Sequence, residues 1–167
     1  MPSPIQIKNI DTRKDYTFGV ISDTHGLLRP EVLAAFAGVD MILHAGDVGD
    51  PDVISDLEAI APLIAVRGNM DYGSWAEKLP VVQSIKVGNG FILLIHDVGW
   101  IDRDIDLTYY QAVINGHTHR PLIEKQDQLL YFNPGSAGHR RHQYPISVGK
   151  LIVRNGRWIP KLMALSP

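Results

Sequence analysis

Short apolar runs alternate with polar loops in the first part of the chain, and this alternation predicts strands separated by helices. The expected strands lie at residues 17–22, 41–45 and 63–66, and the expected helices at residues 29–36 and 51–60. Pro30 suits the first turn of the first helix, while Asp50 can cap the second helix, which begins at Pro51. Two consecutive strand–helix–strand crossovers require parallel strands in one sheet, with the helices packed on its outer face.

The second part of the chain has the pattern of β-hairpins instead. The expected strands lie at residues 81–87, 91–95, 112–115, 122–125, 129–132, 147–153 and 158–163. Asn89 and its flanking glycines form a turn between the first two, and Asn155 with Gly156 forms a turn between the last two, so both pairs are expected to be antiparallel. The two halves together predict an α/β fold, a four-layer αββα sandwich in which two mixed β-sheets pack face to face with helices outside.

The length of 167 residues, with 45% apolar and 20% charged side chains, is typical of one globular domain. We expect a polar N-terminal extension at residues 1–15 and a single domain at residues 16–167. The chain has no cysteine, which excludes disulfide frameworks, thiol nucleophiles, iron–sulfur clusters and cysteine-based zinc sites. Any metal ion must therefore be bound by His, Asp, Glu, Asn or backbone oxygen.

The charge balance argues against two classes of partner. Sixteen Lys and Arg residues against 18 Asp and Glu residues give a formal charge of −2, so no overall basic field attracts duplex nucleic acid or an anionic membrane. The longest apolar stretches, such as residues 91–95, are far shorter than the roughly 20 residues of a membrane-spanning helix. The N-terminal residues lack the apolar segment of a signal peptide. We expect a cytoplasmic protein, and the apolar residues of its second half leave open a homo-oligomeric state.

Polar segments with chemically active side chains follow five of the apolar runs. They contain Asp23 and His25, then Asp47, Asn69, His96, and finally His117 and His119. Because the carboxyl ends of strands deliver such loops to one edge of a sheet, we expect these side chains to converge. Oxygen and imidazole donors without a thiolate suit Mn²⁺, Fe²⁺, Zn²⁺, Ni²⁺ or Mg²⁺.

The number of these candidate ligands indicates more than one ion. Seven ligands exceed a single tetrahedral site and suit two divalent ions that share one carboxylate. In such a centre a water between the ions loses a proton near neutral pH and attacks phosphorus as hydroxide, while both ions withdraw charge from the phosphoryl oxygens. Taken singly, each segment also fits an ordinary loop. A mononuclear hydrolase is the alternative if two or more of the seven side chains point away.

The order and spacing of the five motifs resemble the calcineurin-like metallophosphoesterase superfamily. The motifs read DTHG from Asp23, HAGD to Asp47, RGNMD around Asn69, IH at His96 and GHTH to His119. The later segment NPGS at residues 133–136 resembles one found in the small bacterial and archaeal branch, known as YfcE-like or MJ-type phosphodiesterases. The resemblance covers about residues 16–165 and implies the same αββα sandwich.

The resemblance also implies a role for each ligand. Asp23, His25 and His119 would bind the first ion, Asn69, His96 and His117 the second, and Asp47 would bridge the two. Asp47, Asn69 and His96 would be the catalytic residues, with Asn69 orienting the phosphoryl group. The implied cofactor is a pair of divalent ions per chain, with Mn²⁺ the first expectation. The implied function is that of a hydrolase acting on small phosphodiesters.

Two departures from the family pattern bear on the substrate. His96 is followed by Asp97, where many members have a glycine and a second histidine. Met70 stands where the phosphoprotein phosphatases place a histidine that protonates the leaving group, which favours diesters with acidic leaving groups or another proton donor, such as Asp71, His139 or His142.

The remaining polar residues have simpler interpretations. His44, in the apolar run at residues 41–45, is expected to be a hydrogen-bonded core residue. Arg140, Arg141 and His142 form either a solvated loop or a clamp on the substrate phosphate, because guanidinium groups match phosphoryl oxygens. The competing hypothesis for the whole chain is a non-catalytic metal-binding scaffold on the same fold, similar to a subunit of the retromer complex.

Overall fold

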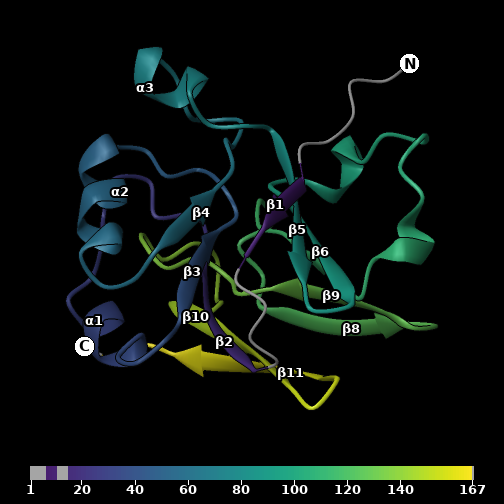
Figure 1. Cartoon of the computed structure of the whole chain (residues 1–167). Helices are drawn as coiled ribbons and strands as arrows, with labels where there is room; N and C mark the ends of the chain where they lie inside the picture. Colours follow the sequence, from purple (N-terminus) through teal and green to yellow (C-terminus); the bar gives the residue numbers. More distant parts are fainter. Residues whose placement is uncertain (1–6, 11–14, 167) are drawn as a thin grey trace.

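Two β-sheets pack face to face in this computed structural model, which describes residues 7–10 and 15–166 (Figure 1). The five-stranded sheet has the order β11-β10-β2-β3-β4. Its strands are β2 (Tyr16–Ile21), β3 (Met41–His44), β4 (Leu63–Ala65), β10 (Ser147–Arg154) and β11 (Arg157–Ala164). β2, β3 and β4 are parallel, as the two crossovers predict, and β10 is antiparallel to both of its neighbours.

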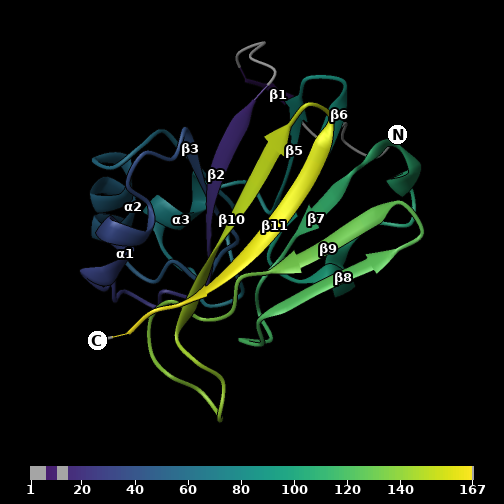
Figure 2. The same ribbon diagram turned by 90° about the horizontal axis from the view of Figure 1, so that it is seen from below.

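The six-stranded sheet has the order β1-β5-β6-β7-β9-β8. Its strands are β1 (Ile7–Asn9), β5 (Val82–Val87), β6 (Gly90–Ile95), β7 (Ala112–Ile114), β8 (Leu122–Gln126) and β9 (Leu129–Asn133). The pairs β5–β6 and β8–β9 are the expected antiparallel hairpins, whereas β7 is parallel to β6 and to β9. Seen from below, β10 and β11 lie between the helical side of the molecule and the β8–β9 hairpin (Figure 2). The predicted pair of mixed sheets is therefore confirmed.

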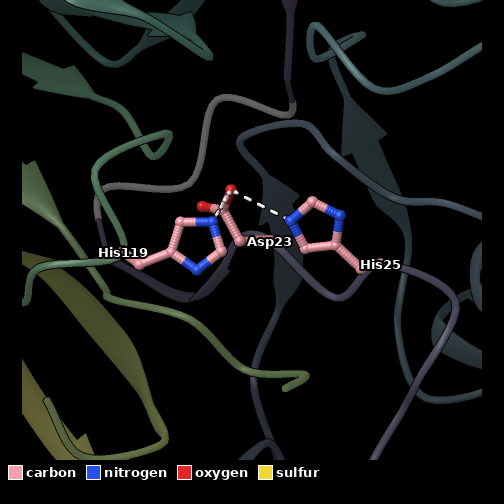
Figure 3. A group of neighbouring side chains, drawn as sticks. All are labelled: Asp23, His25 and His119. Atoms are coloured by element: carbon pink, nitrogen blue, oxygen red, sulfur yellow. Dashed lines mark ion pairs between the residues drawn. The ribbon is translucent and has the colours of Figure 1, made fainter. Parts of the chain in front are cut away.

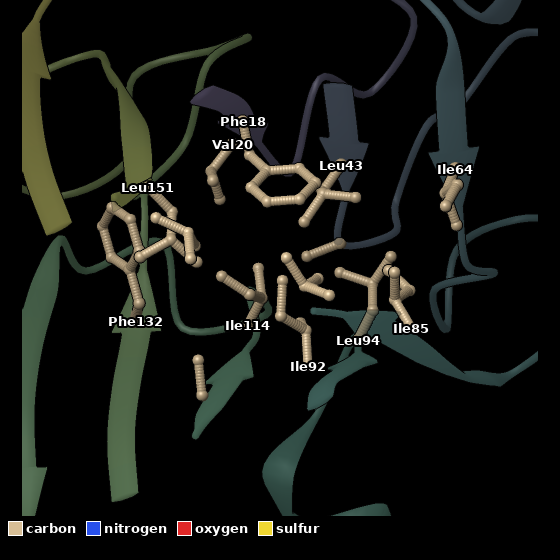
Figure 4. Close-up of a cluster of buried hydrophobic side chains, with 14 of the residues drawn as sticks. Phe18, Val20, Leu43, Ile64, Ile85, Ile92, Leu94, Ile114, Phe132 and Leu151 are labelled. Carbon is tan, nitrogen blue, oxygen red and sulfur yellow. The ribbon is translucent and has the colours of Figure 1, made fainter. Parts of the chain in front are cut away.

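The main hydrophobic core lies between the two sheets (Figure 4). Phe18 and Leu43 extend from the five-stranded sheet toward Ile92, Ile114 and Phe132 of the six-stranded sheet, and all five side chains are fully buried. They belong to the apolar runs that the sequence assigns to strands. Burying such residues is the main favourable term for folding.

Helices cover the outer face of the five-stranded sheet. They are α1 (Glu31–Ala35) and α2 (Pro51–Glu58), while the short α3 (Ser74–Glu77), which the sequence pattern did not predict, lies beyond the end of the sheet (Figure 1). The Asp50 carboxylate accepts a hydrogen bond from the Asp52 backbone at 2.8 Å, which confirms the predicted cap of α2. Val53 and Leu57 of α2 are buried in a second core cluster on this face.

The fourth layer, on the outer face of the six-stranded sheet, is thinner than expected. Leu93 and Val113 are buried there under Ile105 and under Leu107 of the 3₁₀ turn η2 (Leu107–Tyr109), and a second 3₁₀ turn, η1 (Val98–Trp100), precedes them in the same segment. The segment between β6 and β7 is rich in aspartates that cap these turns, and such caps favour short turns over an α-helix. Among the described residues, no helix is long and apolar enough to cross a membrane.

Part of the expected N-terminal extension belongs to the fold. Ile7–Asn9 forms β1, an edge strand that pairs in parallel with β5 from Ser84 to Lys86. The sequence did not predict it because three residues are too few to show an alternating pattern. Residues 1–6 and 11–14 lie outside the described part of the chain.

Candidate metal centre

All seven candidate ligands lie in loops that directly follow strands, as the sequence predicts. Asp23 and His25 follow β2, Asp47 follows β3, Asn69 follows β4, His96 follows β6, and His117 and His119 follow β7. The strands of the parallel parts of both sheets therefore direct their loops to one edge of the sandwich. The structure brings the side chains of these loops within a few ångströms of one another.

One group consists of Asp23, His25 and His119 (Figure 3). The Oδ1 atom of Asp23 lies 3.2 Å from Nε2 of His119 and 3.7 Å from Nε2 of His25. The two imidazole rings stack at a centroid distance of 5.3 Å, with their nitrogens facing the carboxylate. Three donor atoms thus converge on one point from two different loops.

Asp47 lies between this group and a second one. Its Oδ2 atom is 3.6 Å from Nε2 of His25 and 3.3 Å from Nε2 of His96. Asp23, Asp47 and His96 form a further set of converging donors, all of them buried. Asp47 therefore lies within reach of a histidine from each group.

Asn69 and His117 complete the second group. The amide oxygen of Asn69 lies 3.0 Å from Nε2 of His96 and 3.1 Å from Nδ1 of His117. The rings of His96 and His117 meet edge to face at 5.2 Å. His117 and Asn69 are exposed while His96 is fully buried, so this side of the centre opens to solvent.

The residues fit a pair of divalent ions by the chemistry of their donors. Oδ1 of Asp23 and Nε2 of His25 are buried and have no hydrogen-bond partner. Unpaired buried polar atoms are rare in native proteins because each costs about 1–3 kcal/mol. Carboxylate and imidazole donors that face each other without hydrogen-bond partners are what a divalent transition metal would satisfy.

The hydrogen bond of Nδ1 of His96 shows that its other ring nitrogen, Nε2, is the atom available to bind a metal ion. Nδ1 of this ring lies 2.7 Å from the backbone carbonyl of Ala45, to which it can only donate. Nε2 is then unprotonated in the neutral ring and faces Asp47 and Asn69. A backbone carbonyl that holds the far nitrogen in this way orients a metal-binding histidine and raises its basicity.

The charge states of the buried groups favour a bound cation. Burial alone would raise the pKa of Asp23, but the neighbouring imidazole rings of His119 and His25 hold it well below its usual range. Burial opposes ionisation of Asp47 as well, yet the neighbouring His96 lowers the pKa of its carboxyl group. Burial would lower the pKa of His96, but Asp47 and Asp23 together raise it above its ordinary value. Both carboxylates are therefore ionised at neutral pH.

The backbone of the ligand loops is unusual. Five of the seven candidate ligands have a positive φ: Asp23 (55°), His25 (47°), Asp47 (54°), His117 (70°) and His119 (59°). The left-handed region costs about 1–2 kcal/mol for a non-glycine residue. Such strain persists only where the surrounding structure enforces it, and it is concentrated at functional sites.

Asp71 enforces part of this geometry, and its role differs from the expected one. Its carboxylate accepts hydrogen bonds from the backbone of Gly68 at 2.8 Å, Gly49 at 2.9 Å and Val48 at 3.2 Å. Both oxygens are thus engaged as acceptors, so the interpretation of Asp71 as a proton donor to a leaving group is not supported. It joins the loop after β3 to the loop after β4.

Gly68 allows these two loops to approach closely. A Cβ atom at this position would overlap the carboxylate and backbone nitrogen of Asp47. The Met70 backbone donates a hydrogen bond of 2.8 Å to Oδ1 of Asp47, which leaves Oδ2 facing the histidines. Only glycine permits this contact between the loops.

The segment at residues 133–136 braces two further ligand loops, those after β2 and β7. The amide of Asn133 donates to the Gly116 carbonyl at 2.9 Å and to the Thr118 hydroxyl at 3.0 Å, in the loop of His117. The Ser136 hydroxyl donates to the Asp23 carbonyl at 3.1 Å. Sequence reasoning placed this segment near the site only by resemblance, and its hydrogen bonds assign it a supporting role.

His44 is a fully buried, hydrogen-bonded residue, as the sequence suggested. Its Nδ1 accepts from the Gly46 backbone at 3.1 Å, so the proton lies on Nε2, which donates to the Thr24 hydroxyl at 3.0 Å. Thr24 in turn donates to the Val48 carbonyl at 2.8 Å. A neutral His44 therefore connects the loop of His25 with the loop of Asp47.

His44 predicts an acid-dependent loss of stability. Burial lowers its pKa from 6.5 to about 4, against the opposing effect of Asp71, Asp23 and Asp47. Between these values the unfolded chain binds a proton that the folded protein excludes, so stability falls as the pH decreases from 6.5 to about 4. The loss attributable to His44 is on the order of 3 kcal/mol.

Urea denaturation of the metal-free protein at a series of pH values measures this loss. His44→Gln keeps hydrogen-bonding capacity but does not titrate, so its free energy of unfolding should fall less over the same interval. Equal pH dependence of the two proteins would show that His44 is not kept neutral by burial.

The predicted phosphate clamp lies on an exposed loop. Arg140, Arg141 and His142 are all exposed, and no described hydrogen bond or ion pair joins their side chains to a candidate ligand. Arg140 instead lines a hollow of about 290 Å³ together with Arg29 and Glu31. The assignment of these three residues to substrate binding stays a prediction.

Comparisons with known proteins find relatives of this chain. Residues 17–156 match the family profile described as the calcineurin-like phosphoesterase superfamily domain. A protein of Methanothermobacter thermautotrophicus named as a probable metallophosphoesterase is 40% identical over 134 residues, which cover 71% of this chain and 75% of the relative. The phosphodiesterase YfcE of Escherichia coli is 27% identical over 183 aligned positions, which cover 87% of this chain and 96% of YfcE.

The solved structures show the same fold. Vps29 from Chaetomium thermophilum aligns with a TM-score of 0.71 at 19% sequence identity, covering 91% of this chain and 100% of the other. Identity this low shows a shared fold alone. Together with the sequence matches, this confirms the resemblance seen in the five motifs.

Proposed function

The chain belongs to the calcineurin-like phosphoesterase superfamily, and from this premise we propose that it is a metal-dependent phosphodiesterase with two divalent ions in its active site. The observation that carries the proposal is two converging donor groups that share Asp23, one with His25 and His119 and the other with Asp47 and His96, in which buried donor atoms lack partners. The proposed substrates are small phosphodiesters, because the family and the relatives named as phosphodiesterases act on phosphoester bonds.

The ligands divide between the two ions by position. Asp23, His25 and His119 would hold the first ion, and Asn69, His96 and His117 would hold the second, with Asp47 available to both. Mn²⁺ is the first candidate, and Fe²⁺, Ni²⁺, Zn²⁺ and Mg²⁺ suit the same donors. When bound, the pair of ions supplies an activated water as nucleophile and withdraws charge from the phosphoryl group.

The protein's own groups position the substrate. The amide oxygen of Asn69 faces the rings of His96 and His117, so its N–H₂ group points outward and donates to a phosphoryl oxygen. Met70 provides no proton for the leaving group, and Asp71 is engaged with the backbone. Esters whose alcohol leaves readily without protonation are therefore the preferred substrates.

Steady-state hydrolysis tests this function. The protein loaded with Mn²⁺ should hydrolyse bis(p-nitrophenyl) phosphate with a higher kcat/KM than p-nitrophenyl phosphate, and EDTA should abolish both reactions. The two substrates share a leaving group, so their ratio reports the preference for diesters. Absence of turnover with all five metals would contradict the proposal.

The alternative of a non-catalytic scaffold has less support. It rests on the similarity to Vps29, which extends to the fold alone. A scaffold has no need to retain all seven ligand side chains. The same hydrolysis assay separates the two functions, since a scaffold would bind metal without turnover.

A further inference from the structure

Four large apolar side chains are exposed on the two loops that flank His96 and Asn69. They are Met70 and Tyr72 in residues 68–73, and Val98 and Trp100 in residues 96–101. We call these four residues the apolar rim. Residues 68–73 and 96–101 contain no Lys or Arg, although Arg67 directly precedes the first range, so the four side chains offer a substrate apolar and aromatic surface.

Trp100 is the best-placed member of the apolar rim. Its ring centroid lies 5.9 Å from that of His96, at an angle of 52°, so it packs against a buried candidate ligand. It nevertheless remains 40% exposed. The turn that carries it is fixed by Asp97, whose carboxylate accepts from the Gly99 backbone at 2.8 Å. The exposed part of a positioned indole therefore lies beside the open side of the centre.

Met70 also lies beside the candidate metal ligands. Its backbone contacts the carboxylate of Asp47, and its side chain is 49% exposed. Thioethers pack well against aromatic rings because they are polarizable and adapt their shape. Trp100 and Met70 thus offer contacts suited to a flat apolar group.

The other large aromatic residues of this half serve different purposes or lie elsewhere. Tyr110 donates a hydrogen bond to the Ser84 hydroxyl, and Trp158 packs against the main core. Tyr109 is exposed on η2, with no described contact to the candidate ligands. Trp100 is the indole that the fold places beside His96.

We propose that the substituent retained on the phosphate, rather than the leaving group, contains a planar aromatic ring, and that this ring stacks on Trp100. The inference rests on the proposed phosphodiesterase function and adds the class of substituent. Nucleosides and simple aryl groups share this chemistry. Stacking of a base on an aromatic side chain changes affinity by about 5- to 150-fold.

Two diesters with the same leaving group test the proposal. Thymidine 5′-(p-nitrophenyl) phosphate carries a base, and methyl p-nitrophenyl phosphate does not. We expect the wild-type protein to favour the thymidine ester at least about 10-fold in kcat/KM. The ratio should fall to about one in Trp100→Leu and remain largely intact in Trp100→Phe. Tyr109→Leu, the matched control, should keep the wild-type ratio.

A binding measurement extends the test beyond turnover. Thymidine 5′-phosphate should bind the wild-type protein at least about five-fold more tightly than methyl phosphate and quench its tryptophan fluorescence. Trp100→Phe should retain the tighter binding but lose the quenching. Phenyl phosphate distinguishes a simple aryl group from a nucleoside. If it binds as tightly as thymidine 5′-phosphate, any aryl group suffices. If it binds more weakly, the site is specific for a nucleoside.

The outcomes that overturn the inference are distinct from failure of the proposed function. Turnover of both diesters at equal efficiency, or an undiminished preference in Trp100→Leu, would overturn stacking on Trp100 and leave the phosphodiesterase intact. Absence of turnover with either ester would instead overturn the proposed function.

Discussion

Replacing Asp47 with asparagine is expected to reduce kcat/KM for bis(p-nitrophenyl) phosphate by about 10³-fold or more. Asp47 lies between His25 and His96 and is the carboxylate that both proposed ions share. The amide keeps an oxygen that accepts from the Met70 backbone, so the loop should stay folded while the ions lose their common negative charge. The metal content of the variant should also fall below that of the wild type.

Asp50→Asn is the matched control for this prediction. Asp50 caps α2 in the same loop region, and asparagine is an equally good cap, so the control should retain stability and activity. Wild-type turnover and metal content in Asp47→Asn would show that Asp47 does not bridge two ions.

Asp71→Ala is expected to lower the free energy of unfolding by about 3–5 kcal/mol, even without metal. The substitution leaves three backbone N–H groups without their acceptor, at Val48, Gly49 and Gly68. The loops after β3 and β4 would lose their connection beneath Asp47. Urea denaturation of the metal-free protein measures the change.

Asp71→Asn separates this role from acid catalysis. One amide oxygen can still accept, so the variant should lose about half as much stability as Asp71→Ala. Asp56→Ala, at an exposed position of α2, should be nearly neutral. A stable Asp71→Asn protein with greatly reduced turnover would mean that Asp71 acts as a proton donor after all.

The strands and the order of the ligand loops could be predicted from the sequence because both depend on local patterns. Apolar runs such as residues 41–45 and 91–95 become buried strands, and Asp50 with Pro51 begins α2 as expected. In the same way, a His or Asp directly after a strand must lie at the end of that strand. Convergence then follows from the parallel order of the strands.

The supporting contacts could not be predicted because they join segments far apart in the chain. Asp71 resembles an ordinary loop aspartate until its three backbone donors are seen, and Asn133 reaches across to the Thr118 hydroxyl. Similarly, the pairing of β1 with β5 depends on tertiary proximity rather than on a pattern within Ile7–Asn9. The place of Trp100 beside His96 also became visible only in three dimensions.

The central claim is that the seven side chains bind two divalent ions in each chain. Elemental analysis by inductively coupled plasma mass spectrometry tests it most directly, on protein purified without chelator and then equilibrated with Mn²⁺ and desalted. We predict close to two ions per chain in the wild type, and fewer in Asp47→Asn. A wild-type protein that retains one ion, or none, would contradict the account.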